Sequence, residues 1–125
     1  MKLYCCKCEK DVEAQLVKGN VIYPHRQDLY KKNFYRCPFC GGYVGCHDKT
    51  TRPLGCIPTN EIRIARQRVH AKMDPLWKGG KIKRATLYKM ISEKIGYNYH
   101  NGNTKSVQEC LQVYDIIDEI EKQMN

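Results

Sequence analysis

The sequence lacks long hydrophobic runs. None of its apolar stretches approaches the roughly 18 residues that a membrane-spanning helix needs. Residues 1–12 are charged and contain neither the apolar segment nor the small-residue cleavage site of a secretory signal. The sequence also has no internal repeat and no low-complexity segment. These absences predict a cytoplasmic protein without a membrane contact, whose eight cysteines are better explained by metal binding or buried thiols than by disulfides.

Acidic residues are scarce as well. The 125 residues contain 13 Asp and Glu against 22 Lys and Arg, which gives a formal net charge of +9. The net charge is +5 over residues 1–58, +7 over residues 59–95 and −3 over residues 96–125. A basic middle third favours a polyanionic partner, most simply nucleic acid, over a merely solubilising surface. Only 42% of the residues are hydrophobic, so the core is expected to be small and to fit one domain.

Residues 1–58 are predicted to form short strands and turns. The turn residues Lys18-Gly19-Asn20, between two short apolar segments, predict a hairpin. Two prolines and a glycine mark residues 50–58 as a linker or loop. The candidate strands are residues 12–17, 21–23, 29–37 and 41–45.

Residues 59–125 are predicted to form three helices. They cover about Asn60–Met73, about Arg84–Ile95, and a segment that begins near Ser106. Pro75 is expected to end the first helix and Gly96 to cap the second, while Ser106 and Glu109 form a capping box for the third. The predicted apolar stripe of the third helix consists of Val107, Cys110, Leu111, Tyr114, Ile117 and Ile120.

The strongest signal in the sequence is a double pair of cysteines. Each pair is separated by two residues: Cys5 and Cys8, and Cys37 and Cys40. Two thiolates at this spacing can turn back on one ion, and two such knuckles complete a tetrahedral shell of four sulfurs suited to zinc. The 28 residues between the pairs can hold a hairpin that brings the knuckles together. We therefore predict an α+β protein in which an N-terminal zinc ribbon (residues 1–58) packs on a helical segment (residues 59–125) in one compact domain. Its one Zn²⁺ is structural, because four sulfurs leave no position for a reacting water.

A redox site is the main competing interpretation of these cysteines. Cys37-Pro-Phe-Cys40 is similar to a glutaredoxin-type active site, which needs a helix after the motif to lower the pKa of the first cysteine. Here Gly41-Gly42 and a strand-like segment follow instead, and the second cysteine pair would have no role. The context therefore disfavours redox catalysis.

Other cysteines leave the ligand set partly open. Cys6 could replace Cys5, although its spacing to Cys8 makes a poorer knuckle. Cys46 and His47 could supply a substitute ligand or support a second metal; otherwise they are a half-buried thiol and a hydrogen-bonded imidazole. Two further cysteines, Cys56 and Cys110, have no partner at ligand spacing.

The order of motifs along nearly the whole chain resembles one family. The motifs are Cys5-x2-Cys8, CPFCGGYVGCH at 37–47, Pro53-Leu54-Gly55, Arg63-x2-Arg66-x3-His70-x3-Asp74-x-Leu76-Trp77, Arg84-x3-Tyr88, Ile95-Gly96, His100-x-Gly102 and Cys110. This pattern is similar to small phage and prophage proteins known as a zinc-finger-containing domain of unknown function. The resemblance implies a phage or prophage origin, hence a host cytoplasm, and a zinc-bound N-terminal module. It supplies no activity.

Non-enzymatic nucleic-acid binding is the leading functional hypothesis. Basic residues can neutralise phosphates, and interleaved tyrosines can stack on unpaired bases. No helix-turn-helix or RNA-recognition signature is present, so sequence-specific recognition is not expected. The candidate binding residues are Arg26, Lys31, Lys32, Arg36, Arg63, Arg66, His70, Lys81, Lys83 and Arg84.

Two further functions compete with nucleic-acid binding. The first is a protein-binding module, directed at a host enzyme or defence factor, for which the acidic last helix offers a separate surface. The second is a metal-dependent nuclease, in which polar residues on different segments converge. The residues of this candidate polar site are His47, His70, Asp74, Trp77 and His100. The simpler interpretation pairs His70 with Asp74 along one helix. No small-molecule substrate is indicated.

Overall fold

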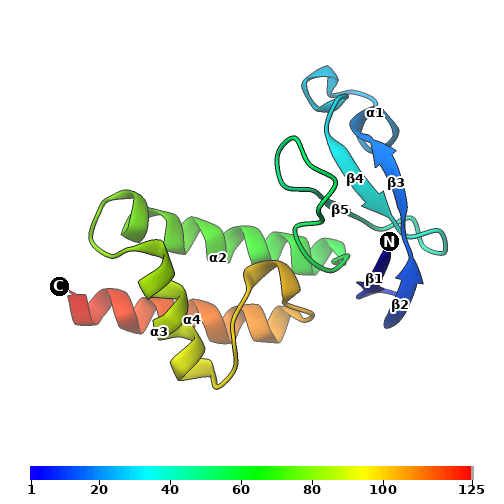
Figure 1. The fold of residues 1–125 in the computed structure, drawn as a ribbon. Coiled ribbons are helices and arrows are strands. Elements are labelled where there is room, and N and C mark those ends of the chain that lie inside the picture. Colours follow the sequence, from blue (N-terminus) through cyan, green and yellow to red (C-terminus); the bar gives the residue numbers. More distant parts are fainter. Residues whose placement is uncertain (125) are drawn as a thin grey trace. The chain divides into compact units, whose positions relative to one another are not determined.

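The computed structural model describes residues 1–124, and it confirms the mixed α+β class (Figure 1). These residues divide into two compact units, Met1–Thr59 and the part of the chain from Asn60 onward, each with its own hydrophobic cluster. The elements of the first unit are β1 (Lys2–Cys5), β2 (Lys10–Glu13), β3 (Gln15–Lys18), the single helical turn α1 (Gly19–Ile22), the 3-10 turn η1 (Gln27–Leu29), β4 (Asn33–Arg36) and β5 (Tyr43–Gly45). Those of the second are α2 (Asn60–Lys78), α3 (Arg84–Ile95), the 3-10 turn η2 (Asn101–Asn103) and α4 (Val107–Met124).

The first unit contains two small antiparallel sheets. One pairs β1 with β2, and the other has the strand order β3-β4-β5. Because side chains alternate between the faces of a strand, Tyr35 and its neighbour Val44 point into the core, whereas Phe34 and Arg36 lie on the outer face. The buried cluster consists of Cys5, Val12, Ala14, Tyr35, Cys37, Val44 and Ile57, so two of the predicted zinc ligands are part of it.

The predicted hairpin around Lys18-Gly19-Asn20 is wrong. Residues 12–17 split at buried Ala14, and their two parts pair with different strands, β1 and β4. Residues 19–22 form the helical turn α1 instead of leading into a strand. The reason lies at Gly19, whose amide donates to the carbonyl of Lys32 at 2.9 Å. A Cβ at this position would lie 1.6 Å from the carbonyl oxygen of Leu29, so only glycine allows residues 19–32 to close on themselves here.

Residues 50–58 are more than a linker. Ile57 is fully buried and forms a parallel bridge with Cys5, while Pro53 bridges Cys46. The strand Lys2–Cys5, which sequence patterning did not predict, is therefore held on one side by β2 and on the other by the segment around Ile57.

The second unit is built on α2 and α4, which run in the same direction (Figure 1). The parallel course follows from the contacts, because Arg66 meets Thr104 just before α4 begins and Lys72 meets Asp118 farther along both helices. Helix α3 and the segment after it return the chain to the start of α4. The buried cluster consists of Val69, Met73, Leu76, Leu87, Ile91, Tyr99, Cys110, Val113, Ile117 and Ile120.

The helix boundaries confirm most of the sequence predictions. Helix α3 has the predicted bounds, and Gly96 caps it in the left-handed conformation with φ of 93°. Ser106 accepts the amide of Glu109 at 3.1 Å, as expected of a capping box. Pro75 does not end α2, which continues to Lys78 because Leu76 is buried in the core and the carbonyl of Pro75 accepts the amide of Gly79 at 3.1 Å.

The predicted apolar stripe of α4 is only half buried. Cys110, Ile117 and Ile120 lie in the core together with Val113, which the prediction omitted. Leu111 is 58% exposed, and the other two members that remain exposed are Val107 and Tyr114. None of the helices in the described part of the chain is long and apolar enough to cross a membrane.

Candidate metal centre

Four sulfur atoms meet where the two Cys-x2-Cys pairs approach each other. The residues are Cys5, Cys8, Cys37 and Cys40, and their Sγ atoms all lie within 4.8 Å of one another. The Sγ atoms of Cys5 and Cys40 are 3.5 Å apart, and those of Cys8 and Cys37 are 3.8 Å apart. A tetrahedral zinc ion with Zn–S bonds of about 2.3 Å places its sulfurs about 3.8 Å from each other. The donor set and its spacing therefore fit one zinc ion held by four thiolates.

The two knuckles share one backbone design. In the first, the amide of Glu9 donates to the carbonyl of Cys5 at 2.8 Å; in the second, the amide of Gly41 donates to the carbonyl of Cys37 at 3.0 Å. The residue after the second cysteine is left-handed in both, with φ of 55° at Glu9 and 76° at Gly41. Glycine adopts this conformation at little cost, whereas Glu9 is held there by the surrounding fold.

Ile57 connects the two knuckles. Its backbone bridges Cys5, and its Cγ2 atom lies 3.2 Å from the position that a Cβ on Gly42 would occupy. That same position is 3.3 Å from the sulfur of Cys40, so a side chain at Gly42 would crowd both Ile57 and the second pair. The segment around Ile57 is therefore part of the support of the metal centre.

Burial and hydrogen bonds shift the pKa values of the zinc-binding thiols in different directions. Burial raises the pKa of Cys5, and it raises the pKa of Cys8 to about 12. Burial also acts to raise the pKa of Cys37, but hydrogen bonds from the backbone N–H groups of Cys40 and Phe39 outweigh it and lower that pKa to about 7. Because zinc binds thiolates, each ligand gives up its proton on binding, and acid opposes the metal.

The substitute ligands considered from sequence are not part of this centre. The sulfur of Cys6 lies 3.9 Å from that of Cys56 and is absent from the four-sulfur group. Cys46 packs against the edge of the core, where burial raises the pKa of its thiol, and the amide of His47 donates to the carbonyl of Arg52 at 2.9 Å. The four cysteines predicted from their spacing are the ones that the fold brings together.

A comparison with protein-family models agrees with this geometry. Residues 2–120 match a family described as a zinc-finger-containing domain. The chain belongs to this family. The match extends beyond the metal centre and includes α2, α3 and most of α4, so this zinc-finger domain comprises both units. No curated protein and no solved structure matches the chain. The family and the four-sulfur site together identify the cofactor as one structural zinc ion.

The predicted nucleic-acid-binding residues have different environments. On the first unit, Arg26 pairs with Asp28 at 2.7 Å and Lys32 pairs with Asp48 at 3.0 Å, all on the surface. On the second, Arg63 is half-buried and donates to Asn60 at 2.8 Å. The remaining exposed members of the set are Lys31, Arg36, His70, Lys81, Lys83 and Arg84.

Arg66, another predicted nucleic-acid-binding residue, is buried and stabilises the fold of the second unit. It is only 8% exposed, and its guanidinium donates to the hydroxyl of Thr104 at 3.0 Å and to the carbonyl of Thr104 at 2.5 Å. His70 is exposed as a whole residue, but partial burial of its imidazole lowers its pKa against the attraction of Asp74, so it carries less positive charge than a free imidazole. Neither residue therefore presents a full positive charge to solvent.

The candidate polar site has three ionisable members in the second unit, His70, Asp74 and His100. They are not among the described residues whose ligand atoms could together hold a metal ion. Asp74 instead pairs with Lys78 at 3.6 Å. Trp77 is half-buried, and Lys78 and Arg84 lie over its ring at 5.4 and 5.8 Å from the centroid. The nuclease hypothesis gains no support from these placements.

Sequence reasoning missed two surface features. One is an aromatic cluster on the outer face of the sheet β3-β4-β5, formed by Tyr23, Phe34 and Tyr43. The other is an apolar groove of ≈ 760 Å³ between α2 and α4. The alternation of Phe34 and Tyr35 could have indicated the first, but Tyr23 reaches it only because residues 19–32 fold back on Gly19.

Proposed function

We propose that the zinc ribbon binds single-stranded nucleic acid, without catalysis, through the outer face of β3-β4-β5. The observation that carries this proposal is the aromatic cluster. Its three rings pack edge to face with centroids 5.5–6.0 Å apart, and the hydroxyls of Tyr23 and Tyr43 are 2.5 Å apart. None of the three belongs to the buried cluster, and each is only half-buried. Aromatic rings that remain accessible on a rigid sheet can stack on unpaired bases.

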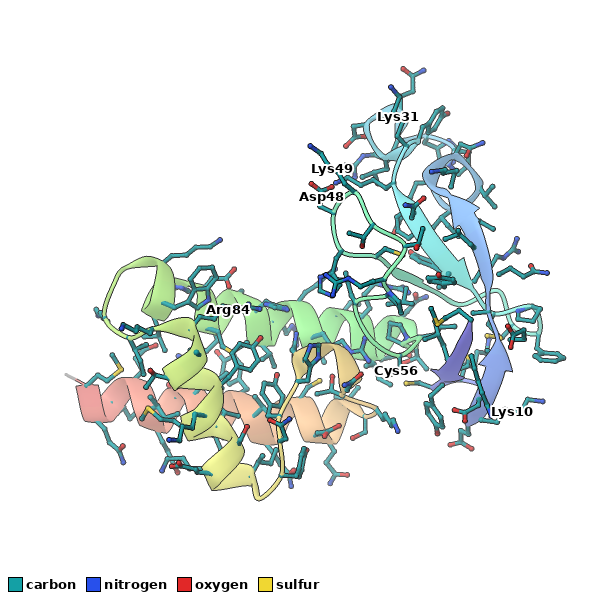
Figure 2. All side chains as sticks on the ribbon, in the orientation of Figure 1. Lys10, Lys31, Asp48, Lys49, Cys56 and Arg84 are labelled. Carbon is teal, nitrogen blue, oxygen red and sulfur yellow. The ribbon has the colours of Figure 1, made fainter. Side chains whose placement is uncertain are left out.

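Arg36 places positive charge beside these rings. Arg36 lies on the same face as Phe34 because the two are separated by one residue along β4, and Arg36 is cross-strand from Tyr43. Lys31 and Lys49, labelled in Figure 2, are further exposed cations in turns of the same unit. Four thiolates and one Zn²⁺ contribute −2, which lowers the formal charge of residues 1–58 from +5 to +3 and that of the chain from +9 to +7. The ribbon stays basic, as binding to a phosphate backbone requires.

Replacing Tyr43 with alanine tests the stacking contribution. We expect its affinity for a fluorescent single-stranded oligonucleotide, measured by polarisation, to fall about tenfold, since one stacked base contributes about 1–3 kcal/mol. The control is Tyr97→Ala, which removes an exposed tyrosine from the second unit and should leave affinity unchanged. Zinc content and thermal unfolding establish that both variants are folded. Equal affinities of Tyr43→Ala and wild type, or binding that is insensitive to salt, would contradict the proposal.

The setting of this activity is part of the same proposal. The motif resemblance to phage and prophage proteins supports a phage-type protein that meets nucleic acid in the cytoplasm of a host cell. The absence of a helix-turn-helix or RNA-recognition signature supports binding without sequence selectivity.

Protein binding is a second candidate function, favoured by the groove on the second unit. Its walls include exposed apolar side chains from both helices: Ile64 is 52% exposed on α2 and Leu111 is 58% exposed on α4. Tyr114 lies at the same surface, under the ammonium group of Lys72 at 5.4 Å. Two parallel helices with an apolar groove between them are suited to an amphipathic helix of a partner protein, which would bury these side chains.

Leu111→Glu is expected to abolish such binding. A carboxylate in the wall of the groove would have to lose its hydration when an apolar helix docks. The measurement is capture of partner proteins from host extract after nuclease treatment, with wild type and variant side by side. Gln112→Glu introduces the same charge at the next, exposed position and should retain the captured protein. Equal capture by Leu111→Glu and wild type would exclude the groove as the binding site.

A further inference from the structure

A second pair of thiols lies beside the zinc centre. The sulfurs of Cys6 and Cys56 are 3.9 Å apart, although 50 residues separate them in the sequence. Neither residue belongs to the four-sulfur group. Cys56, labelled in Figure 2, precedes the fully buried Ile57, and Cys6 follows the zinc ligand Cys5.

Backbone pairing holds these two thiols together. The amide of Cys6 donates to the carbonyl of Ile57 at 2.9 Å, and the amide of Ile57 donates to the carbonyl of Tyr4 at 2.8 Å. Cys5 and Ile57 are thus bridge partners, and both side chains are buried. Cys6, at the start of the knuckle turn, and Cys56 are chain neighbours of these two bridged residues, and their sulfurs lie 3.9 Å apart. The same two hydrogen bonds that position the ligand Cys5 therefore position the second pair of thiols.

The two thiols also differ in accessibility. Cys56 is 6% exposed, whereas Cys6 is partly exposed. Solvent therefore reaches Cys6 more readily than Cys56, and the sulfur of Cys56 lies 3.9 Å from that of Cys6. The sulfur of Cys110, in contrast, lies in the core of the second unit and donates to the hydroxyl of Thr104 at 3.6 Å.

We propose that Cys6 and Cys56 are a site of reversible oxidation, whose disulfide fastens the segment around Ile57 to the first zinc knuckle. With hydrogen peroxide as oxidant, the sulfur of Cys6 attacks one oxygen, the O–O bond breaks, and sulfenic acid and water form. The sulfur of Cys56 then attacks the sulfenic sulfur, the S–O bond breaks, and a second water leaves. Two thiols have lost two electrons and two protons, and the peroxide has become two waters. A dithiol reductant reverses the step by exchange.

The disulfide would retain zinc. Its loop, from Cys6 to Cys56, encloses three of the four ligands, and the bond adds a covalent link across the bridge between Cys5 and Ile57. Zinc release requires the knuckles to open. With the disulfide formed, they would have to open while the first knuckle stays linked to the segment around Ile57. This role does not depend on whether the ribbon binds nucleic acid.

Peptide mapping of the zinc-loaded full chain tests the chemistry. After treatment with limiting hydrogen peroxide and alkylation of the remaining thiols, we expect a Cys6–Cys56 disulfide as the first product, with zinc still bound one to one. Treatment with a dithiol should restore both thiols. The proposal is overturned if the first product is a disulfide that contains a zinc ligand, or if Cys6 is oxidised further without a bond to Cys56.

Zinc transfer to a chromogenic chelator tests the consequence. The oxidised wild type should release zinc about tenfold more slowly than the reduced protein, because the added link opposes opening of the knuckles. Cys6→Ser and Cys56→Ser should show no such change on oxidation, while Cys46→Ser should behave as wild type. If Cys56→Ser fails to fold, Cys6→Ser alone decides the result, since Cys6 is the more exposed of the two. Identical release rates before and after oxidation of the wild type would refute the proposed role.

Discussion

Replacing Cys37 with serine is expected to unfold residues 1–59 and to leave the helices from Asn60 onward folded. Cys37 is 1% exposed and serves both as a zinc ligand and as part of the buried cluster of its unit. A structural zinc site contributes on the order of 10 kcal/mol to folding, as much as the whole net stability of a typical domain. The second unit has a separate cluster of ten buried residues that includes no zinc ligand, so it does not depend on the metal in the same way.

Segment-resolved hydrogen exchange with mass spectrometry distinguishes the two units in this experiment. In Cys37→Ser, amides of β4 and β5 should exchange at unfolded rates, while those of α2 and α4 stay protected, and elemental analysis should find little bound zinc. Cys46→Ser is the matched control, because Cys46 is partly buried near the same core but lies outside the four-sulfur group. It should bind one zinc ion and retain protection throughout. Protected β4 amides in a zinc-free Cys37→Ser protein would show that the metal does not hold this unit together.

Replacing Arg66 with alanine is expected to lower the free energy of unfolding of the helical unit by about 2–4 kcal/mol. The guanidinium satisfies the carbonyl and the hydroxyl of Thr104, which is 1% exposed. That hydroxyl in turn donates to the carbonyl of Asn101 at 2.8 Å, and the side chain of Asn101 accepts the hydroxyl of Tyr99 at 2.7 Å. Removal of the guanidinium would leave a buried carbonyl without its donor and a cavity where the side chain had packed.

Urea unfolding followed by circular dichroism at the helical minimum measures this loss. Arg68→Ala is the control, because Arg68 lies two residues away on the same helix and is exposed; its replacement should change stability by less than about 0.5 kcal/mol. Equal midpoints for the two variants would mean that the buried network contributes little. A lower free energy of unfolding in Arg66→Ala, with no change in Arg68→Ala, would show that Arg66 acts by stabilising the helical unit.

The metal centre was predictable because its signal is local. Each knuckle is a short turn in which two cysteines and a left-handed residue follow one another, so the presence of two such pairs in the sequence indicates the ligands. The helix ends at Gly96 and Ser106 were predictable for the same reason: a cap is decided within a few residues.

Features that depend on distant contacts were not predictable. Residues 12–17 have the composition of one strand, yet they divide because β1 and β4 each take half. Arg66 has the sequence context of a surface cation on a basic helix, and only its contact with Thr104, 38 residues away, shows that it is structural. The approach of Cys6 to Cys56 likewise depends on the bridge at Ile57, in a segment whose prolines and glycine are typical of a loop.

Pro75 gives the wall of the groove a polar feature. Proline has no amide hydrogen, so the carbonyl of Ala71, four residues earlier, does not receive the donor that a continuous helix supplies. Ala71 lines the groove between α2 and α4. The residues that line the groove therefore include one whose carbonyl lacks its helical donor, together with the charged Glu61, Arg68 and Lys72. A helix that docked here would bury apolar side chains and would also have to keep these polar groups hydrated or supply hydrogen-bond partners for them.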